Sequence, residues 1–261
     1  MALHSTLLCA GMLALALSSA SALAVDHERC EILKSRHVMQ SAAPVNCEQL
    51  QLLHFSYIDF AGKRRDDGEI MVMAAAAPQV QAIFETLLKR GFPLARAHPM
   101  EHYQGDDEAS MADNNTSAFN HRPITGGKQL SLHAYGLAID INPLQNPYVR
   151  RDGQGRLLYS PEAGRAYAKR VPPGGDAQPG SSEQVVELFA EHGFFIWGGD
   201  WKKPVDYQHF QVSRNMAERM AGLPLPAARQ LFERSIAAYR ACRRTHQATP
   251  KARTECAAAA G

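Results

Sequence analysis

Two short segments of the chain combine the alternation of a β-strand with side chains that bind metal ions. Residues 137–142 read LAIDIN, so leucine and isoleucine alternate with polar side chains that include Asp140. Residues 207–212 read YQHFQV, and the same alternation separates His209 from the apolar Phe210. Because successive side chains of a strand point to opposite faces, each segment predicts a strand with one face in the core. The opposite face of each strand then carries a potential metal ligand.

A third potential ligand and a further acidic side chain lie near these strands in the sequence. His133 occurs in SLHAYG, just before the first strand, and Asp206 precedes His209 by three residues. Two imidazoles and the Asp140 carboxylate suit zinc and leave a fourth tetrahedral position open for water, as in catalytic sites. Asp206 could accept a proton from such a water. On an ideal strand residues 206 and 209 point to opposite faces, so the strand must begin after Asp206 or bend there.

A simpler explanation of the two histidines has to be set beside the metal site. The chain contains 11 histidines, so His133 and His209 could be unrelated surface or core side chains. The orientation of His209 and Asp140 away from their apolar neighbours favours the metal site. Other common catalytic devices are absent from the sequence, which has no G-x-S-x-G elbow, P-loop, G-x-G-x-x-G or H-E-x-x-H motif.

The remaining sequence predicts a mixture of helices and short strands. Apolar side chains recur at helical spacing after Pro78, and Gly91 ends that helix. A serine N-cap at 181 or 182 and Gly193 bound a second helix. We expect strands at 52–60, 70–73, 92–97 and 194–197, helices at 78–90, 182–192 and 231–240, a turn at 62–68, a long loop at 100–130, a surface excursion at 150–180 and a linker at 223–226.

The N-terminus has the pattern of a secretory signal. Residues 7–23 are almost wholly apolar or small, and they end in ALA at 22–24, which predicts cleavage after Ala24. A transmembrane anchor is the alternative, but alanine, glycine and serine dilute the apolar run. Cys9 does not follow a small residue, so we do not expect lipidation there. The sequence therefore predicts a secreted or periplasmic protein.

The cysteines agree with export. Cys30, Cys47, Cys242 and Cys256 remain after signal cleavage, and an even number in an exported protein indicates two disulfides. Three connectivities are possible. We expect the local pairs Cys30–Cys47 and Cys242–Cys256, because the members of each pair are close in sequence. A metal site made of cysteines is disfavoured, since no C-x-x-C spacing occurs.

The charge balance excludes some classes of partner. Lysine and arginine number 28, and aspartate and glutamate number 26, so the formal net charge is only +2. This balance lacks the strong positive charge of most duplex nucleic-acid binders. No basic run predicts a membrane-binding patch. We expect no nucleic-acid partner, no stable membrane association after signal cleavage, and a monomer.

The two metal-binding segments carry the motifs of a known enzyme family. Residues 131–140, SLHAYGLAID, match the pattern S-x-H-x-x-G-x-A-x-D. Residues 197–201, WGGDW, followed by 206–210, DYQHF, match W-G-G-D-W and D-x-x-H-F. In these motifs the chain resembles the zinc D-alanyl-D-alanine carboxypeptidases of the VanY type and the L-alanyl-D-glutamate endopeptidases of bacterial cell walls and phage endolysins. Residues 110–120 also resemble one branch of the family, and the resemblance covers roughly residues 50–215.

The resemblance implies a fold, a metal and a mechanism. The fold is α+β, with a small, mostly antiparallel sheet, flanking helices, and a hedgehog- or DD-peptidase-like zinc site on the sheet. One zinc ion per chain is held by His133, Asp140 and His209. Asp206 is then the catalytic residue that takes a proton from water and returns it to the leaving amine, while zinc and an arginine stabilise the oxyanion.

The family also uses an arginine that polarises the substrate carbonyl or binds a carboxylate. This role falls first on Arg122 and second on Arg96, and a surface salt bridge is the alternative for either residue. Trp197 could line the cleft or pack in the core. The side chains expected to contact the substrate are Arg96, Asn115, Ser117, Tyr135 and Trp201.

These expectations define a domain plan and a function. The plan has a signal peptide (1–24), a disulfide-pinned N-terminal segment (25–50), a zinc DD-peptidase-like catalytic domain (51–215) and a C-terminal helical segment with a disulfide (216–261). The expected function is hydrolysis of peptide bonds in peptidoglycan stem peptides, of either the D-Ala-D-Ala carboxypeptidase or the L-Ala-D-Glu endopeptidase type. The alternative is a non-catalytic zinc-binding module for cell-wall recognition, as the related hedgehog domains suggest. A metal-free interaction protein would require both motifs to be coincidental.

Overall fold

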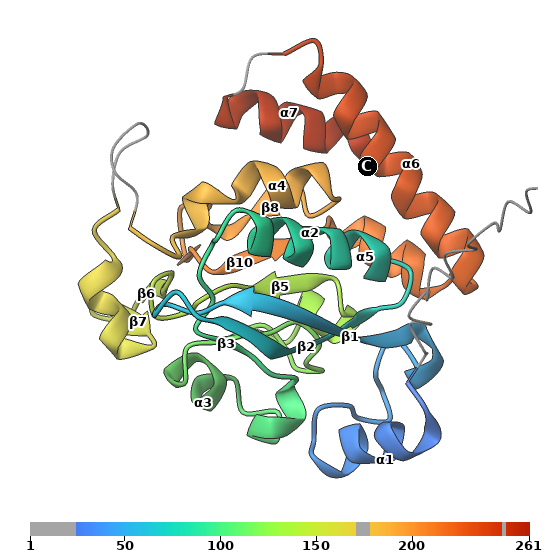
Figure 1. Cartoon of the computed structure of the whole chain (residues 1–261), viewed down its shortest axis with the longest axis horizontal. Helices are drawn as coiled ribbons and strands as arrows, with labels where there is room; N and C mark the ends of the chain where they lie inside the picture. The colour runs from blue at the N-terminus through green and yellow to red at the C-terminus, as the bar shows by residue number, and fades with distance from the viewer. Residues whose placement is uncertain (1–24, 171–177, 247–248) are drawn as a thin grey trace, which may run out of the picture.

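The computed structural model of the chain describes residues 25–170, 178–246 and 249–261. The expected signal peptide and Cys9 lie outside the described residues. Figure 1 shows the strands in the middle of the molecule, with most of the helices on one side and the N-terminal segment and one short helix on the other. This mixture of helices and small sheets is compatible with the expected α+β class.

A β-hairpin forms the first part of the central region. Strand β1 (Leu50–Ile58) pairs antiparallel with β2 (Arg64–Met73), and helix α2 (Ala77–Lys89) packs on the hairpin through stacked Phe55 and Phe84 rings. The sequence predicted a turn at 62–68, but residues 64–68 belong to β2. The prediction located the strand by its apolar side chains, which residues 64–68 lack. This exposed end of β2 is a strand because its backbone pairs with β1.

The two alternating segments that carry Asp140 and His209 form neighbouring strands. Strand β5 (Ala138–Asp140) pairs antiparallel with β10 (His209–Gln211), which pairs on its other side with β8 (Ile196–Trp197). The register places His209 directly opposite Asp140. Because directly opposite residues project from the same face of a sheet, the two side chains meet on one face.

The expected single sheet is divided into several short ones. Strands β3 (Arg96–Ala97) and β4 (Asn115–Thr116) form a parallel pair. A third small sheet is antiparallel, with β6 (Tyr148–Arg151) between β7 (Leu157–Ser160) and β9 (Val205–Asp206).

Several segments predicted to be irregular contain regular elements. Helix α3 (Asp107–Ala112) lies inside the expected loop at 100–130, because the Asp106 side chain accepts a hydrogen bond from the Ala109 amide and caps the helix. Strands β6 and β7 occupy part of the expected surface excursion. Short 3-10 helices cover Cys47–Gln49, Met100–Tyr103, Leu132–Tyr135, Glu162–Tyr167, Ser182–Gln184 and Gly198–Asp200.

The remaining helices lie at the two ends of the described chain. Their bounds are α1 (His27–Ser35), α4 (Val186–Glu191), α5 (Arg214–Ala221), α6 (Leu225–Arg243) and α7 (Pro250–Ala260). Helix α6 is longer than predicted, because the expected linker contributes its first turn, where Pro226 is tolerated. Within the described part of the chain, no helix has the length and apolar character needed to cross a membrane.

Two disulfides fasten the terminal segments, with the local pairing expected from the sequence. Cys30 is bonded to Cys47 near α1, and Cys242 is bonded to Cys256 between α6 and α7. Loops of this size stabilise a fold by roughly 3 kcal/mol each in the chain-entropy account of disulfides.

Candidate metal centre

His133 is positioned by a single turn of 3-10 helix. The Ser131 side chain accepts a hydrogen bond from the His133 amide, and Gly136 ends the turn with a φ of 65°. A Cβ atom added at Gly136 would lie 2.5 Å from the Met73 backbone nitrogen. The glycine of the first motif is therefore needed both for its left-handed backbone and for the close approach of this turn to β2.

His133, Asp140 and His209 converge on one buried point. His209 Nδ1 lies 2.9 Å from Asp140 Oδ1, and His133 Nε2 lies 3.1 Å from Asp140 Oδ2. The two ring nitrogens, His133 Nε2 and His209 Nδ1, are 3.2 Å apart. All three side chains are buried.

The outer nitrogens of both histidines contact carbonyl oxygens. His133 Nδ1 donates to the Ala118 carbonyl at 2.5 Å, and His209 Nε2 donates to Gln211 Oε1 at 2.7 Å. An oxygen of this kind only accepts, so these outer ring nitrogens carry protons. In the neutral form of each ring the inner nitrogen then has the lone pair that a metal ligand requires.

This donor set fits a metal ion. Two lone pairs and a carboxylate facing one another within about 3 Å repel each other unless a cation lies between them. Four ligands at zinc bond lengths of about 2.0–2.1 Å place neighbouring ligand atoms roughly 3.3 Å apart. The observed separations of 2.9–3.2 Å are close to that value.

The electrostatics of the metal-free cluster show the same need for positive charge. Burial works to raise the pKa of Asp140, but His133 and His209 outweigh it and hold that pKa below its usual range. Burial works to lower the pKa of His209, but the hydrogen bond and charge of Asp140 prevail and raise it to about 9. Without a metal, a proton on the cluster supplies the compensating charge.

Asp206 reaches the same cavity because the chain bends between two strands. Strand β9 ends at Asp206 and β10 begins at His209, so the two residues do not belong to one continuous strand. This bend resolves the conflict in side-chain direction that the sequence posed. Asp206 Oδ1 is buried and has no hydrogen-bond partner in the described part of the protein. Burial raises the pKa of Asp206, which reaches about 7 despite the opposing charge of His209.

The second motif packs directly against this carboxylate. A Cβ atom added at Gly198 would lie 2.5 Å from the Asp206 carbonyl oxygen and 2.8 Å from its Cβ. The Trp197 indole donates to the Tyr207 carbonyl at 2.9 Å and stacks against the buried Phe210, so Trp197 is a packing residue. Trp201 instead lines the cavity, with its ring centroid 5.4 Å from that of His209.

The metal cluster and Asp206 open into a cavity of about 330 Å³. Arg122 lines it and is ion-paired through Nη2 with Asp107 Oδ2 at 2.6 Å. Arg214 also lines it, donating to the Leu130 carbonyl at 2.8 Å. The further lining residues are Glu108, Met111, Ile124, Thr125, Ser131, Leu132, Tyr148, Pro204, Gln208 and Gln211. Acidic and basic side chains therefore line the same cavity.

Four of the expected substrate residues are engaged elsewhere. Arg96 pairs with Asp113 at 2.9 Å on the surface, and Tyr135 belongs to the hydrophobic core. The buried Asn115 side chain binds the His98 backbone, and the Ser117 backbone pairs with Asp140. None of these residues lines the cavity. Substrate contacts by Arg96, Asn115, Ser117 and Tyr135 stay predictions that the geometry does not support.

Sequence reasoning missed two residues at the centre. Gln211 follows His209 by two residues in the alternating segment and so shares its strand face, and this spacing is the signal from which its contact with the imidazole could have been predicted. Arg214 gave no such signal, because it follows the strand and enters the cavity from the first turn of α5. Its approach depends on how α5 packs against the His133 turn.

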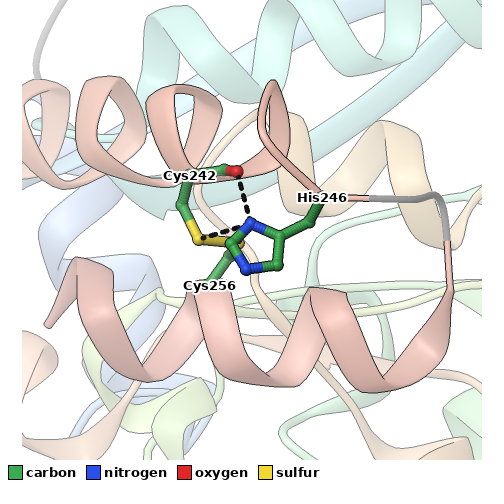
Figure 2. A group of neighbouring side chains, drawn as sticks. All are labelled: Cys242, His246 and Cys256. Carbon is green, nitrogen blue, oxygen red and sulfur yellow. Dashed lines mark hydrogen bonds between the residues drawn. A yellow bond between two sulfur atoms is a disulfide. The ribbon is translucent and has the colours of Figure 1, made fainter.

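A second group of potential metal ligands contains a disulfide bond. Cys242, His246 and Cys256 lie close enough together to hold an ion, but the two cysteines are joined by a disulfide (Figure 2). A disulfide offers no thiolate, which is the form of cysteine that binds metals. His246 Nδ1 donates to the Cys242 carbonyl at 2.8 Å and so caps the end of α6.

Comparison with known proteins agrees with the geometry of the buried cluster. Residues 125–212 match the family model described as D-alanyl-D-alanine carboxypeptidase. This segment is similar to that peptidase family. The match includes His133, Asp140, Asp206 and His209, and it confirms the resemblance seen in the motifs. No curated protein and no solved structure matches the chain. The carboxypeptidase match ends before α5, so the helices α5–α7 lie outside it.

Proposed function

We propose that the chain is an exported zinc metallopeptidase that hydrolyses peptide bonds in peptidoglycan stem peptides. The observation that carries the proposal is the convergence of His133 Nε2, Asp140 and His209 Nδ1 beside the unpartnered carboxylate of Asp206. The carboxypeptidase match supports a peptidase, and the two local disulfides and the apolar N-terminus support export.

The donor set determines which residues would hold the metal and what it would contribute. His133, Asp140 and His209 would be the ligands of one zinc ion, with Ala118 and Gln211 orienting the imidazoles. When bound, zinc supplies a Lewis acid that polarises the scissile carbonyl and makes water more acidic.

Asp206 then moves the proton. Its carboxylate takes a proton from the attacking water and gives it to the nitrogen of the leaving amine. A pKa of about 7 suits both directions of transfer, because the group can be a base and an acid near neutral pH. Arg122 is our candidate for stabilising the negative charge on the carbonyl oxygen, since it lies in the same cavity.

The substrate is argued from the charges of the cavity. Among the residues that the structure describes, Arg214 makes only a backbone hydrogen bond and a 3.9 Å contact with Glu218, so it can turn to a free carboxylate of a ligand. A carboxypeptidase needs such a cation, whereas an endopeptidase does not. We therefore favour the D-Ala-D-Ala carboxypeptidase type over the L-Ala-D-Glu endopeptidase type.

The alternative is a zinc-binding recognition module without catalysis. Such a module has no use for a carboxylate beside the metal with one buried oxygen, Asp206 Oδ1, left without a hydrogen-bond partner, because burying that oxygen costs stability. The position of Asp206 therefore favours the enzyme.

The test is digestion of purified stem pentapeptides, with products identified by mass spectrometry. The zinc-loaded protein is compared with Asp206→Asn and with Asp152→Asn, a control at an aspartate outside the cavity. We expect release of terminal D-Ala by the wild type and the control, and a loss of about 10²–10⁴-fold in rate for Asp206→Asn. A cut between L-Ala and D-Glu would overturn the carboxypeptidase type. No cleavage by folded, zinc-bound protein would overturn the enzyme and favour the recognition module.

A further inference from the structure

A buried arginine in the last helix contacts the second motif. Arg253 lies on α7, its side chain is only 3% exposed, and its Nη2 donates to Asp200 Oδ2 at 2.5 Å. Asp200 belongs to the 3-10 turn between Trp197 and Trp201. A fully buried guanidinium is costly unless it is paired, so this contact has to offset a large desolvation penalty.

The turn that Arg253 holds forms part of the active cavity. Gly198 packs against Asp206, and the Trp201 amide donates to the Gly198 carbonyl at 3.2 Å. Trp201 places its ring against His209 and lines the cavity. A displacement of this turn would therefore move both Asp206 and Trp201.

The disulfide keeps Arg253 in place. Arg253 and Cys256 are three residues apart in α7, so they lie on the same face of the helix, and both are buried. Cys256 is bonded to Cys242 at the end of α6, which joins the two helices (Figure 2). Figure 1 shows the two helices side by side.

Side chains of α6 contact the segment 186–195 directly, whereas the buried face of α7 offers few large side chains for such contacts. Tyr239 stacks on Phe195 with ring centroids 4.7 Å apart, and Arg240 Nε donates to the Glu191 carbonyl at 2.9 Å. The buried face of α7 consists of Ala252, Arg253, Cys256 and Ala260, so its apolar residues are small. The disulfide, the Arg253 ion pair and a hydrogen bond from Ser213 Oγ to the Gly261 carbonyl at 3.3 Å attach this helix.

We propose that Arg253, carried on the disulfide-closed pair α6–α7, is a positioning residue that fixes the Trp197–Trp201 turn and thereby Asp206 and Trp201. Its effect on catalysis rests on the proposed peptidase function. Its effect on the position of the turn is independent of that function, because the fluorescence of the Trp201 indole is sensitive to this position without any substrate. The two tryptophans of the chain both flank this turn.

The test measures tryptophan fluorescence and steady-state kinetics of the full zinc-loaded protein. Arg253→Met keeps the bulk of the side chain and removes the charge, and Arg253→Lys restores a cation. Arg240→Met is the matched control, because Arg240 attaches α6 to α4 without contacting Asp200. A Cys242→Ala/Cys256→Ala variant frees α7 while leaving Arg253 in the chain.

We expect Arg253→Met to shift the tryptophan emission and to lower kcat roughly tenfold to a hundredfold, with a small change in KM, because misplacing a proton-transfer group by about 1 Å has such an effect. Arg253→Lys should recover part of kcat, and the double-cysteine variant should resemble Arg253→Met. If Arg253 acts through Asp200, the variant Asp200→Asn/Arg253→Met should be no slower than either single variant.

Wild-type emission and wild-type kcat in Arg253→Met would overturn the proposal, as would equal losses in Arg240→Met. If Arg253→Met does not fold, the same comparison is made between Arg253→Lys and the double-cysteine variant, and wild-type emission in both overturns it. If the wild type itself cleaves no peptide, the proposed function fails, and the emission of the variants still decides the role of Arg253.

Discussion

His209 lies directly opposite Asp140 on neighbouring antiparallel strands, with Nδ1 of the imidazole 2.9 Å from Oδ1 of the carboxylate. This register converts two alternating sequences that are far apart in the chain into one half of a metal centre. His133 completes it from a turn held against β2 by Gly136. The proposed metal ligands therefore come from two paired strands and a turn packed against β2.

Zinc binding should strengthen as the pH rises toward 9. In the metal-free protein Asp140 raises the pKa of His209 to about 9, so zinc must displace a proton at any lower pH. The apparent affinity should rise by up to tenfold for each pH unit between 6 and 8. Competition with a chromophoric chelator measures it. An affinity that does not change with pH would show that the cluster is not protonated before binding.

Gln211→Ala should weaken zinc binding by about 10–100-fold without abolishing it. The Gln211 Oε1 atom accepts the hydrogen bond that orients the His209 ring, and partners of this kind typically have an effect of that size. Gln81→Ala, on the exposed side of α2, is the control. The dissociation constants of the three proteins can be compared by the same competition. Equal constants for Gln211→Ala and the wild type would argue against an orienting role.

Asp206→Asn should stabilise the metal-free protein at alkaline pH while it removes activity. The pKa of Asp206 is raised to about 7 in the folded chain, so the folded state binds an additional proton between pH 4 and 7. Stability contributed by this group is therefore present at low pH and is lost as the pH rises to 7. The asparagine variant avoids that loss, which is on the order of 4 kcal/mol at about 1.4 kcal/mol per pKa unit.

Chemical unfolding in the presence of a chelator, at pH 4.5 and pH 8, checks this prediction. The two proteins should have nearly equal free energies of unfolding at pH 4.5, and the variant should be more stable at pH 8. A variant that is less stable than the wild type at pH 8 would mean that the carboxylate has a stabilising partner.

Gly136→Ala should destabilise the fold by roughly 2 kcal/mol or more and weaken zinc binding. The alanine would combine a left-handed backbone with a Cβ atom 2.5 Å from the Met73 nitrogen, so the His133 turn has to move. Gly155→Ala is a matched control, because Gly155 also has a positive φ but faces open space. Thermal unfolding should show a clearly smaller loss for the control. Equal losses would mean that only the backbone angle matters.

The sequence predicted the ligand cluster more accurately than the architecture around it. The alternation of apolar and polar residues predicted the strand faces on which Asp140 and His209 lie, and the motifs indicated His133 and Asp206. Alternation cannot specify strand pairing, so the division into several sheets was not predicted. The same limit applies to α3, whose capping residue Asp106 lies in a stretch with few apolar side chains.

Contacts between distant segments account for what the sequence did not reveal. Arg122 and Trp201 reach the cavity, but Arg96, Asn115, Ser117 and Tyr135, which were predicted from the family resemblance, do not line it. Arg214 enters from a helix that the sequence did not place. The contact between Arg253 and Asp200 joins residues 53 positions apart, and no local pattern predicts it.

The most direct test is titration of metal-free protein with zinc while the cleavage of a stem pentapeptide is followed. If His133, Asp140 and His209 hold one catalytic ion, the rate should rise in proportion to added zinc and stop rising at one equivalent per chain. His209→Ala should stay inactive over the same range. Cleavage that is already complete without zinc, or that is absent at one equivalent of bound zinc, would contradict the account.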